Sequence, residues 1–128
     1  SLLEVLKNNK QYEYPQKISE TSIIFKKEKN AAHEEIHCAI AIADTSANVT
    51  QMRQIVDALL SSLKMSYKVK EKDHPSCIPG RSASIMCNNK EIAIFGELHP
   101  QVLQNFQLET PVAVAELNVT EIISLLKN

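Results

Sequence analysis

Two of the four histidines and two of the three cysteines lie between residues 74 and 99: His74, Cys77, Cys87 and His99. Imidazole nitrogen and thiolate sulfur are the usual ligands of structural zinc, which takes four of them, commonly supplied as closely spaced pairs. His74 and Cys77 have this spacing, but Cys87 and His99 are too far apart to form a second pair. Zinc is therefore an alternative, and we expect no metal ligand in this segment.

The same stretch contains the residue types of a cysteine nucleophile. Cys77 lies between two prolines, with His74 or His99 as a candidate base and Glu97 or Asp73 to orient that base. The residues after Cys77 do not begin a helix, whose N-terminus would lower the pKa of a thiol. We expect no catalytic residue here and keep a small cysteine-dependent enzyme as an alternative function.

Two other polar pairs have simpler interpretations. His33 and His37 have the spacing of two ligands on a helix, but the alternation around them predicts a strand, on which they would not converge. We interpret both as surface residues. Arg81 and Glu97 fall almost opposite each other on a hairpin that turns at Asn88-Asn89. We favour a structural ion pair there over the alternative, in which Arg81 binds a phosphate or carboxylate.

The composition is that of an ordinary globular protein, and we expect one domain spanning residues 1–128. Lys and Arg number 14 against 15 Asp and Glu, which argues against a standalone nucleic-acid binder, although an RNA-binding or adaptor module stays an alternative. Two glycines are too few for a glycine-rich phosphate loop. Three unevenly spaced cysteines and no long apolar run indicate free thiols, a cytoplasmic location and no membrane segment.

Hydrophobic periodicity predicts four helices and six strands. We expect the second helix to be capped by Asn48 or Thr50 and the last by Thr120, and the first strand to contain an irregularity. Residues 28–35 are polar and predict a turn, and residues 74–80 predict a loop. The expected helices are 1–9, 48–65, 99–108 and 120–128, and the expected strands are 17–25, 36–44, 66–73, 81–87, 90–98 and 110–119. Adjacent hairpin strands indicate an α+β fold with an antiparallel or mixed sheet.

Three stretches carry a resemblance to a known family: "YPQKISE", "DHPSCIPGRSASI" and "IAIFGELHPQVLQNFQLETPVAVAEL". They resemble the β chain of phenylalanyl-tRNA synthetase in its archaeal and eukaryotic-cytosolic form. The resemblance covers most of the chain from about residue 12 onward. We expect the matched residues to be structural: His74, Pro75, Pro79, Gly80, Arg81, Gly96, Glu97, His99, Pro100, Asn105, Phe106 and Glu116.

The resemblance implies a class II synthetase fold, an antiparallel sheet flanked by helices, in a catalytic-like module that performs no catalysis. It implies a scaffolding role for a catalytic α chain, in an enzyme of two α and two β chains that binds tRNA when assembled. ATP and magnesium are implied for the whole enzyme and no cofactor for this segment. Only two arginines, Arg53 and Arg81, occur in the chain, and this scarcity favours a module without phosphate chemistry.

The sequence departs from the family pattern at several positions. At three of them a large apolar group is missing, which implies altered packing against neighbouring modules rather than altered chemistry. Ser19, Thr21 and Ser22 replace Phe, an aliphatic residue and Gly, Cys77 replaces an aromatic residue, Gln101 replaces Glu, Gln107 replaces Gly and Ala115 replaces Phe.

Overall fold

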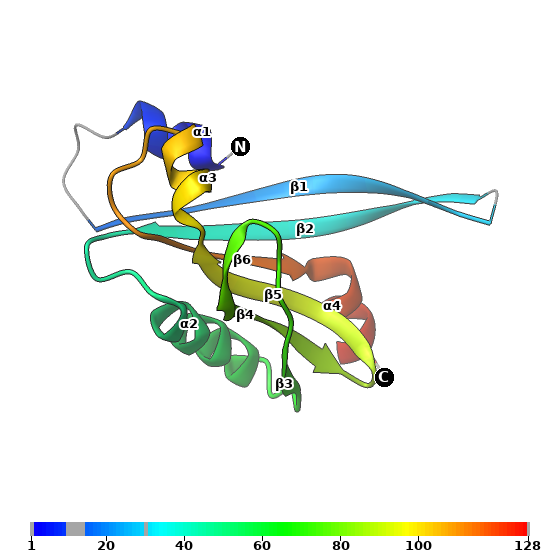
Figure 1. Cartoon of the computed structure of the whole chain (residues 1–128). Helices are drawn as coiled ribbons and strands as arrows, with labels where there is room; N and C mark the ends of the chain where they lie inside the picture. The colour runs from blue at the N-terminus through cyan, green and yellow to red at the C-terminus, as the bar shows by residue number, and fades with distance from the viewer. Residues whose placement is uncertain (1, 10–14, 30, 128) are drawn as a thin grey trace.

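A sheet of six strands lies at the centre of the fold, with helices on both of its faces (Figure 1). The computed structural model describes residues 2–9, 15–29 and 31–127. Tyr14 of the matched stretch, Asn30 of the predicted turn and the outermost residues of the predicted first and last helices lie outside these ranges. In chain order the elements are α1 (Leu2–Asn8), β1 (Gln16–Glu28), β2 (Ala31–Ala43), α2 (Val49–Ser62), β3 (Lys68–Glu71), β4 (Cys77–Cys87), β5 (Lys90–Leu98), α3 (Pro100–Asn105), β6 (Val112–Asn118) and α4 (Val119–Leu126).

The strands lie side by side in the order β1-β2-β6-β5-β4-β3, and every neighbouring pair is antiparallel. The predicted α+β class is confirmed, and the sheet is antiparallel throughout the described residues. β6 is the last of the described strands in sequence but lies between β2 and β5, in the middle of the sheet. No helix in the described part of the chain is long and apolar enough to cross a bilayer.

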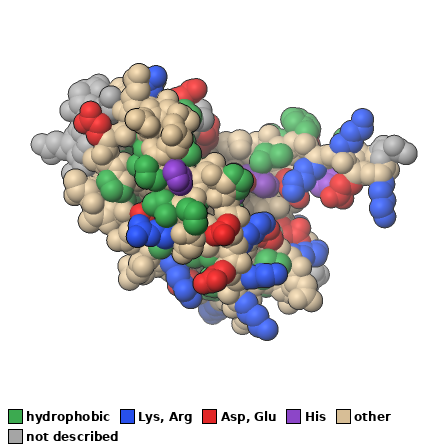
Figure 2. Space-filling model, in the orientation of Figure 1, with side chains coloured by type: hydrophobic (Ala, Val, Ile, Leu, Met, Phe, Trp, Pro, Cys, Tyr) green, Lys and Arg blue, Asp and Glu red, His purple; other side chains and the backbone are tan. Residues whose placement is uncertain are grey.

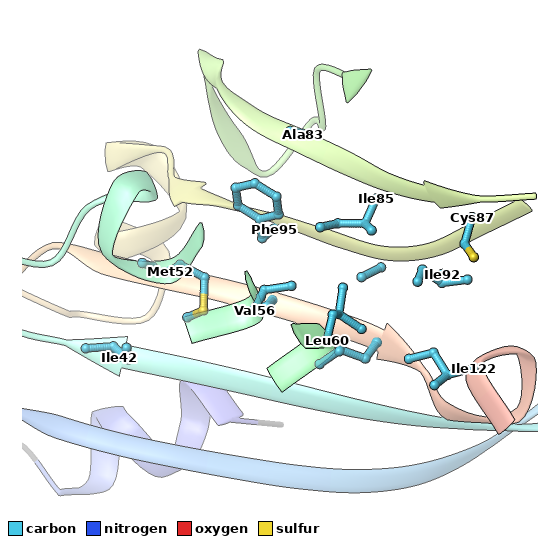
Figure 3. Packing of buried hydrophobic residues seen from close by; sticks show 14 of the residues in the cluster. Ile42, Met52, Val56, Leu60, Ala83, Ile85, Cys87, Ile92, Phe95 and Ile122 are labelled. Atoms are coloured by element: carbon cyan, nitrogen blue, oxygen red, sulfur yellow. The ribbon is translucent and has the colours of Figure 1, made fainter. Parts of the chain in front are cut away.

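The main core lies between one face of the sheet and the helices α2 and α4 (Figure 3). Met52, Val56 and Leu60 are spaced four residues apart, so they line one side of α2, and all three are fully buried. They pack with residues of four strands, including Ile42 on β2 and Ile85 on β4. The amphipathic pattern predicted for this helix is therefore confirmed.

A second, smaller core lies on the opposite face, beneath α1 and α3. Ala41 and Ala43 point into this core, whereas Ile42 between them points into the main one. β2 is thus covered on both faces at this end, and the small alanine side chains let α1 approach closely. The buried residues of this core are Leu6, Ala41, Ala43, Leu98, Leu108 and Val112.

β1 and β2 form a long hairpin that projects beyond the rest of the sheet (Figure 1). β2 pairs with β6 only from His37 onward, so among the described strands residues 31–36 pair with β1 alone. The predicted turn over residues 28–35 is therefore wrong for residues 31–35, which are strand, and most of that stretch is exposed. The predicted irregularity in β1 is also wrong, because its register with β2 runs unbroken from Gln16 to Glu28.

The turn between β4 and β5 and the irregular first part of β4 use residues with positive φ. Asn88 and Asn89 have φ of 51° and 65°, which confirms the predicted tight hairpin. β4 begins at Cys77, within the predicted loop, but its ladder with β5 is interrupted until Ser82. Gly80, with φ of 79°, lies in this interruption, and its N–H donates to Asp73. A residue with a side chain would be strained at this φ.

One of the two predicted helix caps is confirmed. Asn48 caps α2, accepting from the N–H of Gln51 at 2.8 Å, and His99 caps α3 directly before Pro100. The prediction for Thr120 is wrong, because Asn118 caps α4. Thr120 instead accepts a hydrogen bond from the N–H of Ile36 at 2.7 Å, which ties α4 to the base of the projecting hairpin.

Gln107 follows α3 and has φ of 57°, in the left-handed region where glycine is favoured. The resemblance implies glycine at this position, and glycine would adopt this backbone conformation at lower cost than glutamine does.

Candidate functional site

A hollow of about 390 Å³ lies on the face of the sheet opposite α2. Its floor is built from β1, β2, β5 and β6, and α1 and the segment at the start of β4 form its walls. Apolar groups such as Leu2 and Val114 dominate the lining, and Glu20 and Glu116 bring two carboxylates. Among the described residues that line it there is no lysine or arginine. The hollow therefore suits uncharged or cationic groups and repels phosphates.

A second, shallower hollow of about 370 Å³ brings together four residues singled out from the sequence: Asp73, His74, Cys77 and His99. Both histidines use Nδ1 to stabilise the backbone, since His74 accepts from the N–H of Ser76 and His99 from the N–H of Gln101. Across the described residues, no hydrogen bond joins either ring to the Cys77 thiol, and no group of three or more His, Cys, Asp or Glu is arranged to hold a metal.

Cys87 does not join this hollow. It lies at the far end of β4 in the main core, where its thiol donates to the carbonyl oxygen of Ser66 at 3.2 Å. The four potential zinc ligands are therefore brought together only in part.

We expect slow alkylation of Cys77 at neutral pH. Its side chain is buried, and burial raises the pKa of the thiol, so little thiolate is present and reagent access is poor. Mass spectrometry of the native chain during iodoacetamide treatment should show Cys38, which is partly exposed, labelled well before Cys77. Rapid and selective labelling of Cys77 would instead support a nucleophilic cysteine.

Arg81 and Glu97 form the predicted ion pair, with 2.8 Å between Arg81 Nη1 and Glu97 Oε2. Glu97 is buried, and its other oxygen accepts the N–H of Val49, the first residue of α2, at 3.2 Å. The carboxylate thus satisfies one of the unpaired amides at the helix N-terminus as well as the guanidinium. Arg53, the other arginine, pairs with Asp57 at 3.6 Å. The predicted ion pair is therefore present, and the structural role of Arg81 stays a prediction.

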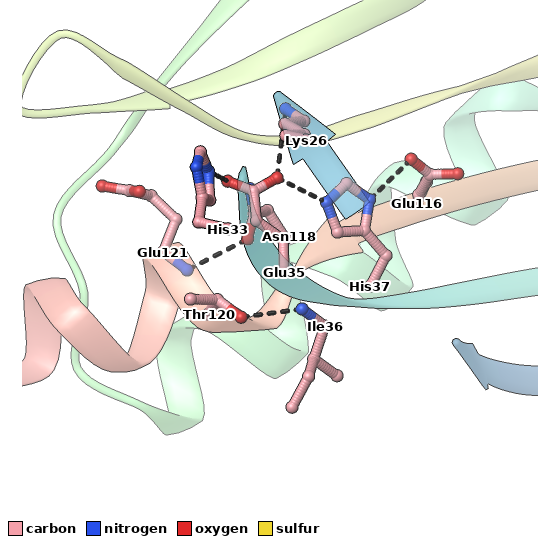
Figure 4. Close-up of polar contacts among 9 residues, drawn as sticks. All are labelled: Lys26, His33, Glu35, Ile36, His37, Glu116, Asn118, Thr120 and Glu121. Carbon is pink, nitrogen blue, oxygen red and sulfur yellow. Dashed lines mark hydrogen bonds and ion pairs between the residues drawn. The ribbon is translucent and has the colours of Figure 1, made fainter. Parts of the chain in front are cut away.

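A polar cluster at the base of the hairpin was missed by the sequence analysis (Figure 4). Glu35 is buried in it and contacts Lys26 Nζ at 3.0 Å, His37 Nε2 at 3.2 Å and His33 Nε2 at 3.7 Å. His37 Nδ1 lies 2.9 Å from Glu116 Oε2. Our expectation that the two histidines do not converge is wrong, because both approach the carboxylate between them, and His37 is only 12% exposed. Both hydrogen bonds of His37 are donated only when both ring nitrogens carry a hydrogen.

The stability of the fold should depend on the ionisation of Glu35. Burial would raise the pKa of this carboxyl, but hydrogen bonds from Lys26, His37 and Asn118 lower it from 4.5 to about 2. The folded state therefore favours the ionised form more than the unfolded chain does. Its contribution to the free energy of unfolding is complete above the unfolded pKa and is lost as the pH falls from 4.5 towards 2.

Urea unfolding at about pH 6 and about pH 3 measures this loss. Glu35→Gln should lose less stability between the two pH values than the parent chain. The exposed neighbour provides a matched control, since Glu34→Gln should behave like the parent. An equal loss in Glu35→Gln and in the parent would contradict the role given to Glu35.

The remaining matched residues occupy backbone-shaping or packing positions. Asn105 Oδ1 accepts from Gln101 Nε2 within the α3 turn, and Phe106 packs against the smaller core. Pro75 and Pro79 line the shallow hollow, and Glu116 takes part in the polar cluster. Their assignment as structural residues stays a prediction.

The model of the phenylalanyl-tRNA synthetase β-chain CLM domain family matches residues 1–119 of this chain. The chain belongs to that family. The predicted resemblance is thereby confirmed.

Curated members of the phenylalanyl-tRNA synthetase β-chain family lie close in sequence. The phenylalanine–tRNA ligase β subunit of Pyrococcus horikoshii is 40% identical over 120 residues, 91% of this chain and 22% of the relative. The corresponding subunits of Thermococcus onnurineus (39% identical over 91% of this chain and 21% of the relative) and Methanosarcina acetivorans (37% over 96% and 22%) are similar. The chain thus spans about a fifth of the length of the curated relatives it matches.

Solved structures with this fold include a pyrrolysyl-tRNA synthetase from Desulfitobacterium hafniense, with a TM-score of 0.77 over 97% of this chain and 46% of that one. A second structure of a pyrrolysyl-tRNA synthetase from the same organism gives a TM-score of 0.76 with the same coverage. The sequences are 9% and 12% identical, so the likeness concerns the fold, and it confirms the predicted synthetase-like architecture of this β-chain family member.

Proposed function

We propose that residues 1–128 form one module of the β chain of a phenylalanine–tRNA ligase, and that this module scaffolds the catalytic α chain without forming aminoacyl-adenylate itself. In this proposal two α and two β chains make the working enzyme, which acts in the cytoplasm and binds tRNA as an assembly. ATP and magnesium belong to the whole enzyme, and the segment itself supplies no catalytic, cofactor or metal residue.

The charge of the large hollow carries the proposal. Activating an amino acid with ATP develops negative charge on a phosphate, which needs cations that converge on it. The hollow offers Glu20 and Glu116 and, among its described lining residues, no lysine or arginine. The two arginines of the chain are engaged elsewhere, Arg53 with Asp57 and Arg81 with the buried Glu97. This charge pattern in a synthetase-like fold favours a scaffolding role over the formation of aminoacyl-adenylate.

Pyrophosphate exchange tests the proposal directly. The purified chain, with ATP, magnesium and phenylalanine, should show no exchange above the background without protein, while circular dichroism verifies that it is folded. Robust exchange by the chain alone would refute the non-catalytic role.

A binding measurement separates the scaffold from the RNA-binding alternative. The chain should bind the α chain in a titration, and its affinity for tRNA alone should be negligible, because its positive and negative charges nearly cancel. Tight, salt-sensitive binding of tRNA without the α chain would favour the RNA-binding alternative instead.

A further inference from the structure

The two edge strands of the sheet differ sharply. β3 is four residues long and has lysines at positions 68 and 70, a common protection against unwanted strand pairing. β1 is thirteen residues long, contains no proline and pairs with β2 without a bulge. Between Ile18 and Phe25 it carries one charged residue, Glu20. Among the described residues no strand lies on its outer side, so β1 presents a long unprotected edge.

An exposed apolar surface accompanies this edge. Ile23 pairs with Ile36 across the hairpin, and Phe25 follows two positions later on the same face. These three side chains are 58%, 40% and 72% exposed. Figure 2 shows hydrophobic side chains gathered on the projecting arm, with charged groups towards its tip. Such a patch beside an open strand edge marks an interaction surface.

The charges of the hairpin favour a protein over a nucleic acid. Residues 16–36 contain Lys17, Lys26, Lys27 and Lys29, and they are balanced by Glu20, Glu28, Glu34 and Glu35. A surface that binds a phosphate backbone needs a net positive charge. The apolar patch and the balanced charges instead fit another β-strand.

We propose that β1 pairs with β1 of a second copy of this chain, antiparallel and centred on Ile23. A two-fold axis perpendicular to the sheet then places Ile23 opposite Ile23 of the second copy and keeps the two apolar surfaces on the same face. Phe25 lies opposite Thr21 of the second copy, so the apolar side chains of both hairpins form one continuous row.

Charge complementarity selects this register. Centring on Ile23 places Glu20 opposite Lys26 of the second copy, twice by symmetry. Lys26 already contacts Glu35 within its own chain but is 47% exposed, so its ammonium has donors left for a second carboxylate. Moving the centre to Ser22 would oppose Lys17 to Lys27, and moving it to Ile24 would oppose Glu20 to Glu28. Like charges directly opposite each other destabilise a strand pair.

Disulfide trapping tests the register. In a Cys38→Ser background, Ile23→Cys should form a covalent dimer under mild oxidation, because directly opposite residues lie within disulfide reach. Phe25→Cys is the matched control, since the two copies of residue 25 would lie four positions, about 13 Å, apart. Equal cross-linking of both variants, or none of Ile23→Cys, would overturn the register.

Sedimentation equilibrium tests the interface itself. The chain should be dimeric at high concentration, and Ile23→Lys should weaken the dimer by about thirtyfold or more, as expected for a central contact. Ile123→Lys on α4 changes an equally apolar, 46% exposed residue away from β1 and should leave the dimer intact. A monomeric parent chain at its highest soluble concentration would overturn the proposal. The inference does not rest on the proposed scaffolding role, since pyrophosphate exchange and dimerisation are measured separately.

Discussion

Gly96→Ala is expected to destabilise the fold by about 3 kcal/mol. A Cβ atom at this position would lie 2.6 Å from Cys77 Sγ, 2.9 Å from Ser82 Cβ and 3.0 Å from the carbonyl oxygen of Arg81. Ser82 is the direct cross-strand partner of Gly96, so the clash falls where β4 resumes its ladder with β5. The backbone oxygen cannot move aside without breaking this ladder. Urea unfolding of the variant and the parent chain measures the loss.

Two further variants separate crowding from backbone strain. Gly80→Ala adds a Cβ with nothing within 4 Å but at φ of 79°, so it should cost about 1 kcal/mol through strain alone. Cys77→Ala in the Gly96→Ala background should recover part of the loss, because it removes the nearest atom. A Gly96→Ala variant as stable as the parent would show that β4 and β5 are not packed as closely as described.

Leu60→Ala is expected to lower the free energy of unfolding by about 2–5 kcal/mol. Leu60 is fully buried in the main core, where α2 meets the sheet, and its truncation leaves a cavity that the surrounding strands close only in part. Alanine is at least as good a helix former as leucine, so the loss reports packing rather than helix propensity. Chemical denaturation measures it.

Leu59→Ala is the matched control for this substitution. Leu59 precedes Leu60 in the same helix and is 41% exposed, so the same truncation should cost well under 1 kcal/mol. Equal losses for the two variants would contradict the orientation of α2 on the sheet.

The parts of the fold that follow from sequence are those with strong periodicity or specific turn residues. Four-residue spacing on α2 and the Asn88-Asn89 turn each allow one local conformation, and the hairpin then places Arg81 near Glu97. The family motifs add the sheet architecture. These features depend on interactions close in the chain or across one short turn.

The projecting hairpin was only partly predictable because the residues at its far end do not pack into a hydrophobic core. Residues 31–35 are polar and mostly exposed, so no alternation of burial marks them as strand, and only pairing with β1 holds them extended. The cluster around Glu35 was missed because it requires Glu116 and Asn118 from β6, which is far away in the chain. The Thr120 hydroxyl accepts a hydrogen bond from the N–H of Ile36 instead of capping α4. Only the tertiary structure brings these two residues together.

The place of β6 has a consequence for synthesis of the chain. β6 joins the β1–β2 hairpin to β5, β4 and β3, and its partners on β2 are separated from it by some 79 residues, as between His37 and Glu116. Before residue 112 has been synthesised, the chain can form two separate groups of strands, β1–β2 and β3–β4–β5. The edges of β2 and β5 that pair with β6 in the folded state are then unpaired. Such long-range closure is slow and leaves edges open to wrong pairing. The sheet becomes complete only when β6 has been synthesised and has paired with β2 and β5.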